Sequence, residues 1–261
     1  MNKLKYRKDH LVELLQEKGE LQVSAIAELY GISLPSVRRL CANLEKEKKA
    51  IRTHGGLRTI HEKNDPYEFE IIDTEYAVEK AAIAQYAVNL IGNRQSVFLE
   101  SGTTLKQFAK ALAGRLQKAE ILDSVIFTNS LVNFEILQPI SKVILIGGLY
   151  SPERRNFYGF LCEKLIRSLR FDVCFMGADG ISLENGIMAL DAETVRLDEL
   201  LIKNSEKSIL LSNSEKFSKN SLLPFCSVKD IHMIVTDSKL PKHIQDDYTA
   251  ANVNVVCVNS V

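Results

Sequence analysis

The sequence has no net charge, no Cys-x-x-C pair and no apolar run of 18 residues. Without such a run or a signal-peptide pattern, we expect a cytoplasmic protein that does not bind a membrane. The five cysteines are scattered and odd in number, and the five histidines do not cluster, so we expect no disulfide framework, metal site or cofactor. What remains is an ordinary globular composition, 46% hydrophobic and 25% charged, over a length of 261 residues that suits one or two domains.

The zero net charge conceals an uneven distribution. Residues 1–60 contain 12 Lys/Arg against 7 Asp/Glu, whereas the remaining residues contain 21 against 26. A basic head on an acidic body is typical of a nucleic-acid-binding module joined to a domain of another kind. Chance scatter over a short window is the alternative.

The segment 21–44 predicts two short helices separated by a tight break. Ser24 suits the N-cap of the first helix, and Gly31 suits its end because glycine takes the left-handed conformation without steric cost. Ser33 suits the N-cap of the second helix, with Pro35 acceptable in its first turn. One apolar stripe runs along the second helix, formed by Val37, Leu40, Cys41 and Leu44.

The other face of this second helix suits the major groove of DNA. Arginine binds guanine, and asparagine binds adenine, through paired hydrogen bonds. The arrangement is typical of a helix-turn-helix, whose second helix reads the bases. The predicted DNA-binding residues of this helix are Ser33, Ser36, Arg38, Arg39 and Asn43. An ordinary helical hairpin with a solvated basic face is the alternative.

Flanking segments complete a winged domain at residues 1–60. A helix over 5–18, with Leu11, Leu14 and Leu15 facing inward, would pack behind the helix-turn-helix. After Leu44, Ile51 and Thr53 alternate with polar residues and Gly55-Gly56 permits a tight hairpin. This wing supplies two further predicted DNA-binding residues, Arg52 and His54, and basic side chains for phosphates at Lys48, Lys49 and Arg58. A solvated charge run is the alternative for its lysines.

Residues 61–74 lose periodicity and contain Pro66, so we expect a linker there and a second domain over 75–261. Residues 75–91 predict an amphipathic helix with Ala77, Ala81, Ala84, Ala87, Val88 and Ile91 on or near its buried side. Apolar strands follow at 96–99, 125–128, 143–146, 173–176, 209–211, 233–235 and 253–258. Helical runs at 104–113, 131–137, 160–169, 192–204 and 241–250 separate them, which predicts an α/β domain with a mainly parallel sheet covered on both faces.

Small polar residues and glycines follow several of these strands, as in Ser101–Thr104, Asn129-Ser130, Gly147-Gly148 and 177–180. Ligands of open parallel sheets bind beyond the carboxyl ends of the strands. Ser101–Thr104 lies where a strand leads into a helix, so its N–H groups, hydroxyls and helix dipole favour an anion such as phosphate. Lys216, after a later strand, adds positive charge. The alternative is that these are capping and turn residues.

Two sets of motifs, in the expected order, resemble the DeoR family of bacterial transcription regulators. The first set comprises Ile26-Ala27, Gly31-Ile32-Ser33, Ser36-Val37-Arg38-Arg39, Leu44-Glu45 and His54-Gly55-Gly56. The second comprises residues 98–104, 128–130, 147–148, 177–181 and 216–217. The resemblance covers about residues 7–256 and implies a winged helix-turn-helix joined to a sensor domain similar to ribose-phosphate isomerases.

The family resemblance also implies repression of genes for sugar or polyol uptake and catabolism, relieved by a phosphorylated sugar. By that resemblance Ser101, Gly102, Thr103 and Thr104 hold the phosphate, while Asn129, Gly148, Asp179 and Lys216 surround the sugar. Paired operator half-sites imply a homo-oligomer, a dimer or tetramer, on double-stranded DNA. The alternatives are an isomerase-like enzyme with an appended DNA-binding module, which we do not expect, and a regulator with a vestigial sensor.

This sequence departs from the family pattern at several positions. Leu40 replaces an acidic residue, Lys48 a glycine and Glu100 an aspartate. Asn213 replaces an aspartate, and Asp198 stands where many members carry a lysine. A negative charge in a phosphate pocket repels phosphate. If Asp198 faces the pocket, we therefore expect the effector to be less acidic, differently placed or absent.

Overall fold

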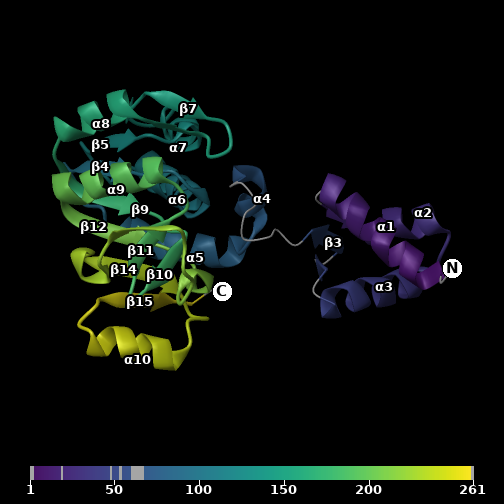
Figure 1. Cartoon of the computed structure of the whole chain (residues 1–261). Coiled ribbons are helices and arrows are strands. Elements are labelled where there is room, and N and C mark those ends of the chain that lie inside the picture. Colours follow the sequence, from purple (N-terminus) through teal and green to yellow (C-terminus); the bar gives the residue numbers. More distant parts are fainter. Residues whose placement is uncertain (1–2, 19, 48, 53–54, 60–67, 260–261) are drawn as a thin grey trace. The chain divides into compact units, whose positions relative to one another are not determined.

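The computed structural model describes residues 3–18, 20–47, 49–52, 55–59 and 68–259. The chain divides into two compact units, residues 1–66 and 67–261, and each unit is considered by itself (Figure 1). In the part of the chain so described, no helix is both long enough and apolar enough to span a membrane.

The first unit is a small helical domain with a three-stranded antiparallel sheet. Its elements in chain order are α1 (Lys3–Lys18), β1 (Glu20–Gln22), α2 (Val23–Tyr30), α3 (Leu34–Lys46), β2 (Ala50–Arg52) and β3 (Gly56–Thr59), and the strand order is β1-β3-β2. Its core contains the predicted apolar stripe of α3 together with side chains of α1, α2, β2 and β3, namely Leu11, Leu15, Ile26, Val37, Leu40, Cys41, Leu44, Ala50 and Leu57. The predicted helix-turn-helix and wing are therefore present.

The helix ends of this unit confirm most of the predicted signals. Gly31 ends α2 in the left-handed conformation, with φ 58°. Ser33 is the N-cap residue of α3, although its hydroxyl contacts Ser36 Oγ at 3.0 Å and does not cap a backbone N–H. The prediction for Ser24 was wrong, since α2 begins at Val23. Val23 N donates to Gly55 O at 2.7 Å, so the wing backbone satisfies a first-turn N–H there.

Gly56 of the wing was predicted to form part of a tight turn, but it has a different role. Gly56 lies in β3 and pairs with Gln22 of β1. A Cβ atom at Gly56 would lie 2.1 Å from Leu21 O, so a larger residue could not approach β1 so closely. The predicted wing residues Thr53 and His54 lie outside the described residues.

The second unit is built on a seven-stranded, entirely parallel sheet with the order β15-β14-β12-β9-β4-β5-β6. All seven predicted strands belong to it. They are β4 (Ser96–Leu99), β5 (Val125–Thr128), β6 (Val143–Leu145), β9 (Phe171–Met176), β12 (Ser205–Leu211), β14 (Met233–Asp237) and β15 (Val255–Val258). The predicted parallel sheet is therefore confirmed.

Helices cover both faces of this sheet (Figure 1). One face packs against α5 (Ala77–Ala87), the 3-10 helix η1 (Val88–Leu90), α6 (Thr103–Gln117) and α7 (Leu131–Leu137). The other face packs against α8 (Phe160–Arg167), α9 (Ala192–Asn204) and α10 (Lys242–Ala250). Within β4, Phe98 faces the helices α8, α9 and α10, whereas Val97 and Leu99 face α5, α6 and α7. A continuous apolar strand is therefore buried on both sides.

Three features of this unit differ from the sequence-based expectation. Residues 69–74, predicted as linker, form helix α4 (Phe69–Thr74), because Phe69 is buried and its N–H donates to Glu153 O at 2.9 Å. Ala77 and Ala81 of α5 are exposed, and the buried side contains Lys80 and Ile83 instead. Two small sheets were missed, β7 (Leu149–Ser151) with β8 (Asn156–Tyr158), and β10 (Gly180–Ser182), β11 (Gly186–Ala189) and β13 (Leu223–Cys226). Strands of three or four residues carry too little periodicity to be recognised.

The strand order creates a crevice beside β4. The chain moves from β4 to β5 and β6 in one direction, then returns to place β9 on the opposite side of β4. Connections that leave two neighbouring strands in opposite directions open a space beyond their carboxyl ends. The candidate pocket of this unit lies at this point.

Candidate functional site

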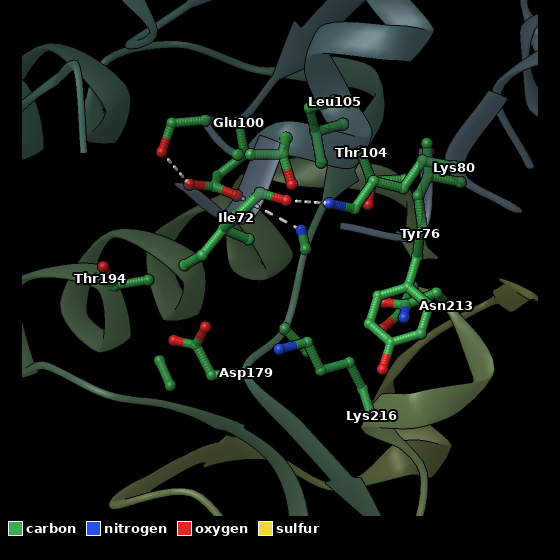
Figure 2. A pocket seen from close by; sticks show the side chains of 18 of the residues that line it. Ile72, Tyr76, Lys80, Glu100, Thr104, Leu105, Asp179, Thr194, Asn213 and Lys216 are labelled. Carbon is green, nitrogen blue, oxygen red and sulfur yellow. Dashed lines mark hydrogen bonds between the residues drawn. The ribbon is translucent and has the colours of Figure 1, made fainter. Parts of the chain in front are cut away.

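The pocket is lined by segments that follow β4, β9 and β12, together with α4, α5, α9 and the loop between β7 and β8. Residues 100–105 follow β4, residues 177–179 follow β9, and residues 212–213 follow β12. Figure 2 shows side chains from these separate segments converging on one space. The topology of the sheet therefore brings together residues that are more than 100 positions apart.

The loop after β4, where the sequence predicts an anion, forms one end of this pocket. Gly102 is the N-cap residue of α6 and has φ 123°, a conformation that side-chain-bearing residues rarely adopt. Thr103 and Thr104 begin the helix, where backbone N–H groups have no intrahelical acceptor and the helix dipole favours negative charge. Ser101 Oγ donates to Glu100 Oε1 at 2.6 Å and accepts from Asn156 Nδ2 at 2.8 Å, which fixes the loop.

Two lysines and an arginine supply positive charge to the pocket. Lys80 lies in the buried side of α5, where its Nζ donates to Ile72 O at 2.6 Å and burial lowers the pKa of its ammonium to about 8. Lys216 belongs to the 3-10 helix η2 (Ser214–Lys216), and in Figure 2 its side chain extends toward Asp179. Arg154 Nη2 lies 2.8 Å from Asp191 Oδ2 and 3.5 Å from Asp179 Oδ2.

Two buried carboxyl groups line the same pocket. Glu100 is 5% exposed, and burial raises the pKa of its carboxyl to about 7, against the lowering effects of the Ser101 hydrogen bond and Arg154. Asp198 is 1% exposed, and burial, followed by the Glu100 charge, raises the pKa of its carboxyl well above the ordinary value. Asp198 therefore does face the pocket, on the buried side of α9.

Six of the eight predicted effector residues line this pocket: Ser101, Gly102, Thr103, Thr104, Asp179 and Lys216. The structure does not place Asn129 and Gly148 there. Asn129 Nδ2 donates to Phe157 O at 3.1 Å, and a Cβ at Gly148 would lie 2.3 Å from Tyr158 O. Both residues position the β7–β8 hairpin, because its backbone passes very close to the ends of β5 and β6.

Several pocket residues were not among the predicted effector residues, among them Tyr76, Lys80, Arg154, Thr194 and Ser212. Lys80 carried a usable signal, since it lies one helical turn from Ala84 and two turns from Ala87 in an apolar stripe. Arg154 carried none, because it lies in a short loop whose position depends on the rest of the fold. Among the residues that the structure describes, no group of three or more His, Cys, Asp or Glu side chains is placed to hold a metal ion.

In the first unit, the predicted reading face of α3 is available to solvent. Ser33, Arg38, Arg39 and Asn43 are exposed and Ser36 is half-buried, whereas Val37 and Leu44 are fully buried. Arg52 in β2 is also exposed, and its Nη1 lies 3.5 Å from Glu45 Oε2. A solvated ion pair of this kind contributes little to stability and is readily exchanged for a phosphate contact.

Comparison with known proteins identifies both units. Residues 7–63 match the DeoR-like helix-turn-helix domain, and residues 75–238 match the DeoR C terminal sensor domain. The L-fucose operon activator of Haemophilus influenzae is 28% identical, over 93% of this chain and 95% of its own. The lactose phosphotransferase system repressor of Staphylococcus epidermidis is also 28% identical, over 89% and 91%.

Among solved structures, a ribose 5-phosphate isomerase from Plasmodium falciparum aligns with a TM-score of 0.42 and 16% identity, over 56% of this chain and 55% of that protein. The curated relatives are named as transcriptional regulators and not as enzymes, in agreement with the expected role. The helix-turn-helix match over residues 7–63 and the sensor-domain match over residues 75–238 together show that this chain belongs to the DeoR family of transcriptional regulators.

Proposed function

We propose that this protein is a cytoplasmic repressor of genes for sugar or polyol uptake and catabolism, and that a phosphorylated sugar or polyol binds the pocket and releases or repositions it on DNA. Relatives named for fucose and lactose operons support the class of regulated genes. One of these relatives is named an activator and the other a repressor, so the choice of repression over activation is part of the proposal.

The observation that carries the effector proposal is the position of the Ser101–Thr104 loop. It forms the N-terminal end of α6 inside a pocket that also contains Lys80 and Lys216. Free backbone N–H groups, hydroxyls and two cations at one site suit a phosphate. Asp179, whose Oδ2 accepts from Leu190 N at 3.0 Å, is held where it can accept hydrogen bonds from sugar hydroxyls.

The DNA-binding part of the proposal rests on α3. Arg38, Arg39 and Asn43 contact base edges, Ser33 and Ser36 contact the backbone at the start of the helix, and Arg52 and His54 contact phosphates from the wing. Two such domains, supplied by a dimer or tetramer, bind paired operator half-sites. Effector binding then shifts the population of sensor conformations and, with it, the spacing of the paired domains.

The test uses the full-length protein and a duplex obtained by in vitro selection with it. Fluorescence anisotropy at fixed salt measures DNA affinity, and thermal denaturation measures binding of phosphorylated sugars and polyols. A ligand at 100 times its dissociation constant adds about 2.7 kcal/mol to stability. We expect one class of sugar phosphate both to raise the melting temperature and to weaken operator binding. If no sugar phosphate does either, the sensor is vestigial and the effector proposal is wrong.

A further inference from the structure

Three residues that line the pocket carry buried polar side-chain atoms that have no hydrogen-bond partner among the described residues. They are Asp198 Oδ1, Ser212 Oγ and Asn213 Nδ2, on side chains that are 1%, 2% and 3% exposed. Leaving a buried polar group unpaired is costly, so such groups in native proteins normally have a partner. Their common position in one pocket indicates that a bound molecule supplies the missing hydrogen bonds.

The carboxyl groups decide which kind of molecule fits. Asp198 lies on the buried side of α9, and Glu100 directly follows β4, next to the Ser101–Thr104 loop. Arg154, whose charge acts on both groups, is also bound to Asp191 and Asp179 at 2.8 and 3.5 Å. A buried carboxylate is stable only when a cation or several donors face it. The Glu100 and Asp198 end of the pocket therefore favours a ligand group that donates hydrogen bonds and carries positive charge.

We propose that the effector is a phosphorylated sugar or polyol that carries an amino group, whose phosphate binds the Ser101–Thr104 loop while its ammonium binds between Glu100 and Asp198. An ammonium has three donors and no acceptor, which matches two carboxylates. An acidic sugar would be repelled by the ionised form of either group, and a neutral hydroxyl would bring no positive charge to stabilise that form. This inference rests on the proposed function and specifies its ligand.

Proton release accompanies this binding. In the free protein, burial raises the pKa of Glu100 to about 7, so part of this group is a neutral carboxylic acid at pH 7, and burial raises the pKa of Asp198 in the same direction. The ammonium favours the ionised carboxylates, so the proton leaves to solvent. The other charged groups that line the pocket or act on this pair are Glu75, Lys80, Arg154, Asp179, Asp191, Glu215 and Lys216.

Isothermal titration of the full-length protein tests this assignment. The probes are glucosamine 6-phosphate and galactosamine 6-phosphate, each compared with the hexose 6-phosphate of the same configuration and with inorganic phosphate. We expect an amino sugar phosphate to bind about 10- to 100-fold more tightly than its hexose counterpart, as for a charged hydrogen bond. Titrations in two phosphate-free buffers of different ionisation enthalpy should show net proton release near pH 7.

Two variants sharpen the assignment. Asp198→Asn should abolish most of the preference for the amino sugar phosphate and reduce the proton release. Glu199→Gln is the matched control, because Glu199 is the next residue of α9 and is exposed outside the pocket, and this variant should keep both properties. Because the wild-type comparison alone measures the preference, the test does not depend on the folding of either variant.

Equal or tighter binding of the hexose 6-phosphates to the wild-type protein would overturn the ammonium assignment and leave the sugar-phosphate function standing. Binding of none of these phosphates, with inorganic phosphate also inert in thermal denaturation, would overturn both. A preference that survives in Asp198→Asn would also contradict the assignment.

Discussion

Helix α3, predicted to read DNA, and the proposed effector pocket use charge in opposite ways. In α3, Arg38 and Arg39 stand in solvent beside a helix face that is completely buried. In the pocket, Lys80, Glu100 and Asp198 are themselves buried. Burial lowers the pKa of Lys80 and raises the pKa of Glu100 and Asp198, so the neutral form of each is favoured. Exposed charged side chains can replace their contacts with water by contacts with DNA phosphates and bases at little cost to folding. Buried charged side chains instead affect the stability of the domain and the choice of ligand.

Arg39→Ala is the strongest test of the role of the exposed charges in α3. Loss of a bidentate contact to guanine should weaken binding to the selected duplex by about 1–3 kcal/mol, with a much smaller loss on random DNA. The melting temperature should not change, because the side chain is exposed. Anisotropy titrations on both duplexes measure this difference. An equal loss on both would make Arg39 a phosphate contact.

Thr103→Val addresses the anion-binding end of the pocket. Valine keeps the shape of this buried side chain but removes the hydroxyl at the first turn of α6. We expect the response of DNA binding to the effector to be lost or reduced by roughly 10-fold, while affinity for DNA without effector stays intact. Operator titrations with and without the sugar phosphate measure both quantities. An unchanged response would place the phosphate elsewhere.

The pH dependence of stability tests the buried carboxyls. Burial raises the pKa of Glu100 to about 7, so the folded protein holds this proton more tightly than the unfolded chain, and stability is lost as pH rises from about 5 through 7. Burial acts on Asp198 in the same direction. The melting temperature of Asp198→Asn should therefore rise relative to wild type as the pH rises, by roughly 2–4 °C for each kcal/mol relieved. A difference that is constant with pH would show that Asp198 does not titrate in this range.

Arg52→Ala should have the mildest effect. Its exposed guanidinium is expected to contact a phosphate, so its loss should weaken binding to all duplexes about equally and reduce the slope of affinity against salt by about 1. Titrations at several salt concentrations measure the slope. A loss confined to the selected duplex would instead assign base reading to the wing.

Much of this architecture was predictable because its signals are local. The apolar stripe of α3, Gly31 at the end of α2 and the seven continuous apolar strands follow from side-chain periodicity and backbone preference. The errors have local causes as well. Residues 69–74 looked like a linker because one buried Phe69 in a six-residue helix gives no periodic pattern. Ser24 was a good N-cap candidate, but a backbone bond from Val23 to Gly55 replaced it.

The sequence by itself determined the two units, helix α3 of the helix-turn-helix and the polar loop after β4, because each depends on neighbouring residues. Only the tertiary structure decided which charges are buried together. Glu100 and Asp198 meet because β9 returns to the side of β4 opposite β5, and α9 then packs over the sheet. Asn129 and Gly148 follow β5 and β6, and they contact the backbone of the β7–β8 hairpin instead of the pocket. Residues at the ends of parallel strands converge only where the strand order brings those strands together.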